Sequence, residues 1–131
     1  LGARWTTPGR ALTTKADVLA PCALGGSLTV AAASTIRARV IAGAANNQLD
    51  EPAAAAALQA AGILWAPDFV VNAGGVIYIG AELDGPYDPD TARQRVLAIG
   101  DTLDAILDDA ERRNVTPYAA AMDRARALIT R

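Results

Sequence analysis

The first half of the chain contains three short apolar runs, at residues 16–23, 38–45 and 62–67. None of them alternates polar and apolar residues, which is the pattern of strands that are covered on both faces of a sheet. We therefore predict strands at residues 17–20, 39–43 and 63–66.

Segments that favour helices separate these runs. Residues 29–38 form a candidate short helix, and residues 52–61 form a stronger one, with Pro52 in its first turn and Gly62 as its C-terminal cap. Strands and helices that alternate at this spacing predict a parallel α/β sheet with right-handed connections. The loosest stretch is residues 6–15.

The pattern becomes helical after residue 67. We predict helices at residues 74–84, 89–113 and 117–130. Asp88 caps the second of them, and Asn114 ends it in the left-handed conformation. Its apolar stripe recurs at three- and four-residue steps and consists of Val96, Ile99, Leu103, Ile106, Leu107 and Ala110. The last helix places Tyr118, Met122, Ala125 and Ile129 on one face.

These elements predict the second half of a Rossmann-like doubly wound parallel sheet, followed by a C-terminal helical tail. The half sheet occupies about residues 1–72 and the tail about residues 73–131. In such sheets, ligands bind beyond the carboxyl ends of the strands. The whole chain is interpreted as part of one dinucleotide-binding domain.

Composition excludes several functions. The 12 Lys and Arg residues and 14 Asp and Glu residues give a net charge of −2, so no basic patch is expected to bind nucleic acid. No apolar stretch approaches the roughly 20 residues that cross a bilayer. The single Cys22 argues against a disulfide framework and favours the cytoplasm. The absence of histidine excludes a Ser-His or Cys-His pair within this chain, and we predict no metal site.

Two adjacent asparagines, Asn46 and Asn47, follow the second apolar run directly. They could close a turn, since asparagine tolerates left-handed dihedrals. They could also bind a ligand, because an amide offers both a donor and an acceptor and can recognise another amide, such as the carboxamide of nicotinamide. Their position at a strand end favours ligand contact. Cys22 and Ala23 follow the first run in the same way, and Cys22 is more typical of an inert buried thiol than of a nucleophile.

Asn72 follows the third run and precedes Gly74 and Gly75. We expect it to cap a helix that the glycines open, where free N–H groups would face an anion such as an α-carboxylate, or a ribose hydroxyl. The three strand-end loops should therefore meet in one crevice.

Four segments carry a family resemblance. They read APCALGG (20–26), VIAGAANNQL (40–49), GILWAPDFVVNAGGVI (62–77) and IGDTL (99–103). Their order and spacing resemble the C-terminal half of the leucine, valine and phenylalanine branch of the glutamate dehydrogenase superfamily. The resemblance implies NAD-dependent oxidative deamination of an L-amino acid to its 2-oxo acid and ammonia.

The resemblance also implies residue roles. Cys22 and Ala23 belong to a loop that lines the cofactor's ribose, and Ala45 and Asn46 lie at the nicotinamide. Asn47 braces their loop, although the roles of the two asparagines could be exchanged. Asn72 lies between the nicotinamide ribose and the substrate carboxylate.

The substrate pocket is expected to follow Gly75. Val76 and Ile79 stand at positions where glutamate-specific relatives supply a hydroxyl, and neither can bond a distal carboxylate. We predict an apolar substrate, with valine, leucine or isoleucine preferred to phenylalanine.

The chain departs from the family pattern in what it lacks. The catalytic lysines and aspartate of the family belong to an N-terminal domain, and that domain and the G-x-G-x-x-G turn are absent from residues 1–131. We assign no catalytic residue and expect a piece of a longer enzyme, inactive alone. The first strand should have an unpaired edge, which favours association, and we expect a homo-oligomer. The alternative is a non-catalytic nucleotide-binding or oligomerisation module.

Overall fold

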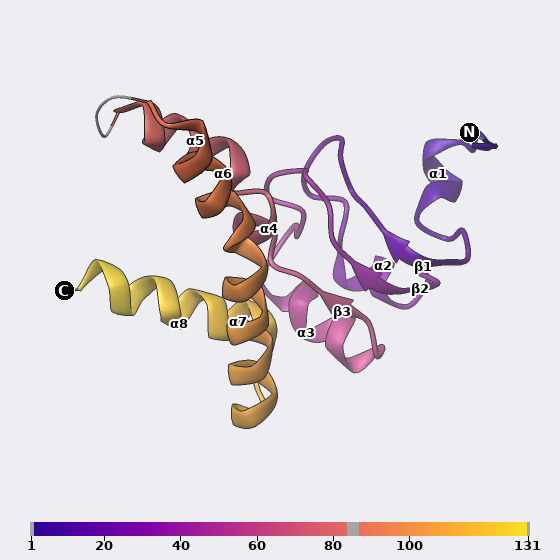
Figure 1. Ribbon diagram of the computed structural model, residues 1–131. Helices are drawn as coiled ribbons and strands as arrows, with labels where there is room; N and C mark the ends of the chain where they lie inside the picture. The colour runs from indigo at the N-terminus through magenta and orange to yellow at the C-terminus, as the bar shows by residue number, and fades with distance from the viewer. Residues whose placement is uncertain (1, 84–86, 131) are drawn as a thin grey trace.

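A three-stranded parallel sheet organises the first half of the protein. The computed structural model describes residues 2–83 and 87–130 (Figure 1). Strands β1 (Ala16–Leu19), β2 (Ala38–Ile41) and β3 (Leu64–Trp65) are adjacent in that order, and both pairings are parallel. The predicted parallel α/β sheet is confirmed, with strand ends shifted by one or two residues.

Three helices accompany the sheet: α1 (Pro8–Ala11), α2 (Val30–Ala33) and α3 (Ala53–Ala60). The helix predicted at residues 29–38 is shorter than expected, because Thr29 caps α2 and Ala38 already belongs to β2. The stretch at residues 6–15, predicted to be loose, contains α1. The core beside β2 contains the fully buried Leu28 and Leu58.

Among the described residues, five helices follow the sheet: α4 (Asp68–Val71), α5 (Gly74–Leu83), α6 (Pro89–Leu97), α7 (Ile99–Arg113) and α8 (Pro117–Ile129). The single helix predicted at residues 89–113 is wrong. Ala98, with ψ of −5°, ends α6 and precedes α7, so the chain turns between them. Residue 84, the predicted end of α5, lies outside the described residues.

Predicted caps set the start of α6 and the ends of α3 and α7. Asp88 accepts a hydrogen bond from the backbone N–H of Asp90 at the start of α6. Asn114 adopts φ of 52° and ends α7, as predicted for a left-handed cap. Gly62 adopts φ of 72° after α3. Local sequence therefore determines these ends.

Two hydrophobic clusters stabilise the fold. One surrounds the sheet, and the other joins α7 to α8 through Ile106, Ala110, Ala120 and Ala121. The predicted stripe on α7 is thus its packed face. Ile129, predicted on the packed face of α8, is 84% exposed because α8 extends beyond its neighbours (Figure 1).

The sheet has an open side at β1. Within the described residues β1 pairs only with β2, and its Val18 side chain is 55% exposed. This agrees with the expected unpaired edge.

Candidate functional site

The loops after β1 and β2 are joined by backbone hydrogen bonds. The N–H of Ala45 donates to the carbonyl of Pro21 over 2.9 Å, and the N–H of Gly26 donates to the carbonyl of Asn47 over 2.7 Å. The carboxyl ends of parallel strands meet at one edge of a sheet, so these contacts place both loops on the same rim.

Two glycines allow this close approach. A Cβ atom on Gly25 would lie 2.5 Å from the carbonyl oxygen of Asn46, and one on Gly43 would lie 2.2 Å from that of Pro21. Each loop therefore offers a glycine to the backbone of the other. The sequence analysis gave neither glycine a role, and the signal available was the run of small residues in each loop.

The loop after β3 is connected through a pair of asparagine side chains. Asn72 Nδ2 donates to Asn46 Oδ1 over 2.6 Å and lies 3.5 Å from the carbonyl oxygen of Ala45. Ala45 is buried, Asn72 is half-buried and Asn46 is exposed. The structure thus brings together asparagines 26 positions apart in sequence.

The pair retains hydrogen-bonding capacity. Within the described part of the chain, no partner is recorded for Asn46 Nδ2 or Asn72 Oδ1. One amide donor and one amide acceptor consequently remain for a ligand. A carboxamide has the complementary acceptor and donor.

The expected capping role of Asn72 is wrong. Asn72 ends the short helix α4, and its side chain turns to Asn46 instead of capping α5. The sequence analysis missed α4. This helix begins after Pro67, and the Asp68 carboxylate accepts a hydrogen bond from the N–H of Phe69 in its first turn.

The other residues expected at the cofactor occupy the same two loops. Asn47 is exposed and adopts φ of 51°, the dihedral of a turn residue. Cys22 is an exposed free thiol, not the buried one expected. Cys22 and Ala23 line a hollow of about 530 Å³ at the end of β1.

Gln48 lies beneath the asparagine loop and is fully buried. Its Nε2 donates to the carbonyls of Gly43 and Ala45 over 2.8 and 3.0 Å, and its Oε1 accepts from Trp65 Nε1 over 3.1 Å. Its backbone N–H donates to Asp68 Oδ2 over 2.9 Å. Gln48 and Asp68 were not predicted to support the site, although a glutamine within an apolar and small-residue segment was a signal.

The residues expected at the substrate lie on α5. Gly75 is exposed, and Val76 and Ile79 are 76% and 57% exposed. Their side chains are thus available to a ligand or to another part of the protein, and the predicted shared cavity stays a prediction.

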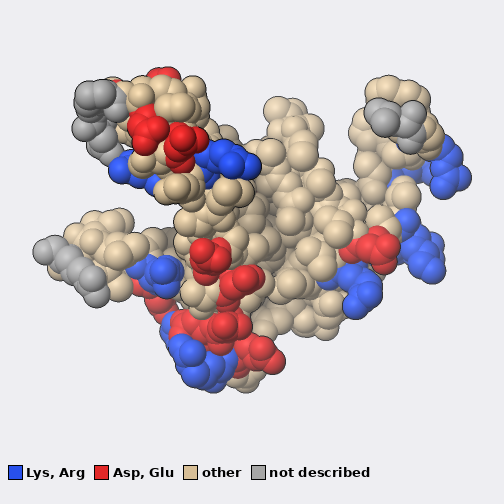
Figure 2. Space-filling model, in the orientation of Figure 1, with Lys and Arg blue, Asp and Glu red and all other residues tan. Residues whose placement is uncertain are grey.

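The candidate rim carries little charge. Residues 20–28 and 42–49 contain no charged side chain, and Figure 2 shows acidic groups gathered along α7 instead. No group of three or more potential metal ligands occurs among residues 2–83 and 87–130. Because these two loops carry no charged side chain, the site can select neutral hydrogen-bonding groups.

Among residues 2–83 and 87–130, no helix combines the length and apolarity that crossing a membrane requires.

Titration shifts occur away from the rim. A hydrogen bond with Tyr78 raises the pKa of Tyr87 to about 12. A hydrogen bond from Arg113 lowers the pKa of Asp109, and Arg113 also bonds Asp123, which joins α7 to α8. These groups have structural contacts and no link to the asparagine pair.

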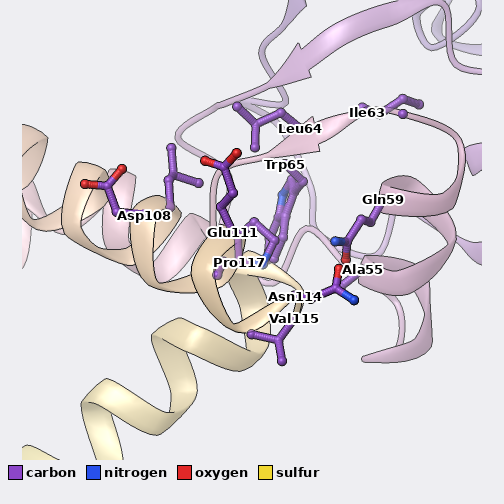
Figure 3. Close-up of a pocket in the computed structure, with 13 residues that line it drawn as sticks. Ala55, Gln59, Ile63, Leu64, Trp65, Asp108, Glu111, Asn114, Val115 and Pro117 are labelled. Carbon is purple, nitrogen blue, oxygen red and sulfur yellow. The ribbon is translucent and has the colours of Figure 1, made fainter.

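A second hollow lies at the far edge of the sheet. It has a volume of about 490 Å³ between α3, β3 and the end of α7, where Figure 3 shows Gln59 on one side and Glu111 on the other. None of the residues expected to bind cofactor or substrate lines this hollow.

Comparison with known proteins identifies the chain's relatives. It is 39% identical over 120 residues to leucine dehydrogenase of Geobacillus stearothermophilus, covering 92% of this chain and 32% of that enzyme. It is 47% identical over 105 residues to valine dehydrogenase of Streptomyces albus, covering 80% of this chain and 29% of that enzyme. The chain thus spans about a third of the length of these relatives.

Solved structures of amino acid dehydrogenases also match the chain. L-Tryptophan dehydrogenase from Nostoc punctiforme matches with a TM-score of 0.87 and 42% identity, over 94% of this chain and 37% of that one. Hetero-hexameric glutamate dehydrogenase from Thermus thermophilus matches with a TM-score of 0.70 and 25% identity, over 92% of this chain and 30% of that one. The family model of glutamate/leucine/phenylalanine/valine dehydrogenase matches residues 2–126. The chain belongs to this dehydrogenase family.

Proposed function

We propose that this chain is the cofactor-binding part of an NAD-dependent dehydrogenase that converts an apolar L-amino acid to its 2-oxo acid and ammonia. The observation that carries the proposal is the hydrogen-bonded pair of Asn46 and Asn72 on the strand-end rim, 2.6 Å apart. Family membership implies a nicotinamide cofactor. Such a pair offers the donor and acceptor that the nicotinamide carboxamide requires.

The residues on the rim fit this cofactor by their chemistry. Asn46 Nδ2 would donate to the carboxamide, and Asn72 Oδ1 would accept from the carboxamide or from a hydroxyl of the nicotinamide ribose. Asn72 Nδ2 would bind the substrate carboxylate only by giving up its present acceptors, Asn46 Oδ1 and the carbonyl of Ala45. Ala45 beneath the pair and the Cys22–Ala23 loop would line the nicotinamide riboside. When bound there, NAD would supply the hydride acceptor for oxidation at the substrate's α-carbon. The chain's own contribution is to hold the ring in one orientation, which favours transfer by proximity.

The apolar character of α5 supports the substrate class. Val76 and Ile79 lie one helical turn apart and offer no hydrogen bond, so a distal carboxylate facing them would be unpaired. Three of the four relatives reported above are named for leucine, valine and tryptophan, at 39–47% identity, and the fourth is named for glutamate, at 25% identity. We therefore infer activity on valine, leucine or isoleucine, lower activity on phenylalanine, and rejection of glutamate.

Catalytic groups and assembly complete the proposal. The chain supplies no catalytic residue of its own, so the lysines and aspartate of the family have to come from another part of the enzyme. The hexameric relative supports an oligomeric assembly, which we propose to be a homo-oligomer. The single exposed thiol favours a reducing cytoplasm.

Asn46→Ala in the whole enzyme tests the function. We expect NAD affinity or turnover to fall about tenfold, because one hydrogen bond to a buried ligand amide is lost. Asn114→Gly is a matched control: it also removes an amide, and glycine suits its φ of 52°.

Two outcomes would contradict the proposal. Unchanged kinetics of Asn46→Ala would leave this asparagine as a turn residue only. NAD binding by the wild-type protein without turnover of any amino acid would favour the non-catalytic module.

A further inference from the structure

Gln48 differs from the asparagines beside it in burial. Asn46 and Asn47 are exposed, whereas the side chain of Gln48 is fully buried beneath them. A buried amide is unfavourable unless its donors and acceptor are bonded. No buried side-chain nitrogen or oxygen lacks a partner within the described residues, so Gln48 is satisfied. Its position therefore depends on a specific set of partners.

Those partners fix the orientation of the amide. Both groups that accept from Nε2 are backbone carbonyls, those of Gly43 and Ala45, and neither can donate. The group that faces Oε1 is Trp65 Nε1–H, which cannot accept. In a flipped amide, Oε1 would face the two carbonyl oxygens and Nε2 would face the N–H of Trp65, so none of the three hydrogen bonds would form. The side chain is consequently locked in one orientation.

The hydrogen bonds of Gln48 connect three parts of the rim. The two carbonyls belong to the loop that carries Asn46, and Trp65 belongs to β3. The backbone of Gln48 adds a bond to Asp68, at the start of the helix that ends at Asn72. Both asparagines of the candidate site are thus held relative to each other through Gln48.

We propose that Gln48 is a positioning residue for nicotinamide, acting through Asn46; this inference rests on the proposed function. Gln48 lies beneath the loop and does not contact the ligand. It holds the carbonyls of Gly43 and Ala45, and thereby sets the direction of the Asn46 side chain, which follows Ala45. Trp65 Nε1 holds the oxygen of the same amide by donating a hydrogen bond to Oε1.

The test compares two ligands in the whole enzyme. NAD contains nicotinamide, whereas ADP-ribose lacks it and keeps the remainder. Gln48→Met preserves side-chain length but removes the three side-chain hydrogen bonds. We expect the KM for NAD to rise about tenfold, while the inhibition constant of ADP-ribose changes less than twofold. Gln59→Met, an exposed glutamine on α3, is the matched control and should change neither constant.

A double variant tests the route through Asn46. In an Asn46→Ala background, Gln48→Met should leave the ratio of the KM for NAD to the inhibition constant of ADP-ribose unchanged. The reason is that the Asn46 amide, which Gln48 positions, is gone. If Gln48→Met does not fold, Trp65→Phe removes the donor to Oε1, keeps both acceptors of Nε2, and replaces a core indole by a smaller ring. It should raise the KM for NAD about threefold with ADP-ribose unaffected.

Equal weakening of both ligands, or no weakening, would overturn the positioning role. An additive effect in the Asn46→Ala background would overturn the route through Asn46. Failure of the wild-type enzyme to oxidise any apolar amino acid with NAD would instead overturn the proposed function. The two failures are therefore distinguishable.

Discussion

Gly25→Ala should disrupt the candidate site through one added methyl group. The φ of Gly25 is not in the left-handed region, so the backbone itself accepts alanine. The obstacle is the opposite loop, because the new Cβ would lie 2.5 Å from the carbonyl oxygen of Asn46 and 2.6 Å from that of Asn47. Both obstructing atoms are backbone, and a side-chain rotation cannot relieve the contact.

The displacement follows from these distances. An ordinary carbon–oxygen contact is about 3.3 Å, so the carbonyl of Asn46 has to move by about 0.8 Å. The bond between Asn46 and Asn72 is 2.6 Å long, and a shift of that size brings it to the outer limit of hydrogen bonding. Misplacing a catalytic contact by about 1 Å can cost about 100-fold in rate. We expect kcat/KM for NAD to fall about 10- to 100-fold.

The assay is NAD reduction by the whole enzyme at a saturating concentration of valine or leucine. Gly100→Ala is the control: its added Cβ meets no atom within 4 Å, so it should retain wild-type kinetics. Circular dichroism and Tm show whether the Gly25→Ala enzyme is folded. A folded variant with kcat/KM within twofold of wild type would refute the reasoning.

Three further predictions concern stability and specificity. Leu58→Ala should lower the free energy of unfolding by about 2–5 kcal/mol, measured in urea, because Leu58 is fully buried in the sheet core; a loss below about 1 kcal/mol would contradict its core role. Ile79→Ala should raise the ratio of kcat/KM for phenylalanine to that for valine, and an unchanged ratio would remove Ile79 from the pocket. Arg113 lowers the pKa of Asp109, so this carboxylate stabilises the fold above its ordinary pKa, and the contribution is lost as the pH falls through the lowered value. The Tm difference between wild type and Asp109→Asn should therefore be small and salt-sensitive at pH 7 and vanish in acid; a difference that grows in acid would contradict the assignment.

Local patterns predicted the elements whose causes are local. The absence of alternation in the strands indicated a parallel sheet, and Asp88 and Asn114 set helix ends as predicted. The break at Ala98 had one weak signal, Gly100 two residues later, because glycine costs about 1 kcal/mol in a helix interior. Alanine itself is the best helix former, so the apolar stripe outweighed this signal and one long helix was predicted.

The sequence indicated the edge of the sheet where the candidate site lies, but not the contacts that hold its residues in position. A strand end followed by asparagines indicated the rim. Asn72 was assigned both to ligand binding and to a helix cap, and the cap was wrong because the glycines after it gave a strong local signal. The contact with Asn46 is made across 26 residues. The role of Gln48 likewise depends on Trp65, 17 residues away, and no pattern within the loop reveals it.

Tyr118 is the aromatic link between the two hydrophobic clusters. Its ring centroid lies 6.4 Å from that of Trp65 and 6.3 Å from that of Phe69, while the α7–α8 cluster has its own alanine-rich contacts. Val70 of α4 also packs on that cluster, and we expect the helix pair, with its own cluster, to open as a separate foldon while the sheet stays closed. Amide protons of α7 and α8 should then exchange with solvent together, through fluctuations that leave those of β2 protected.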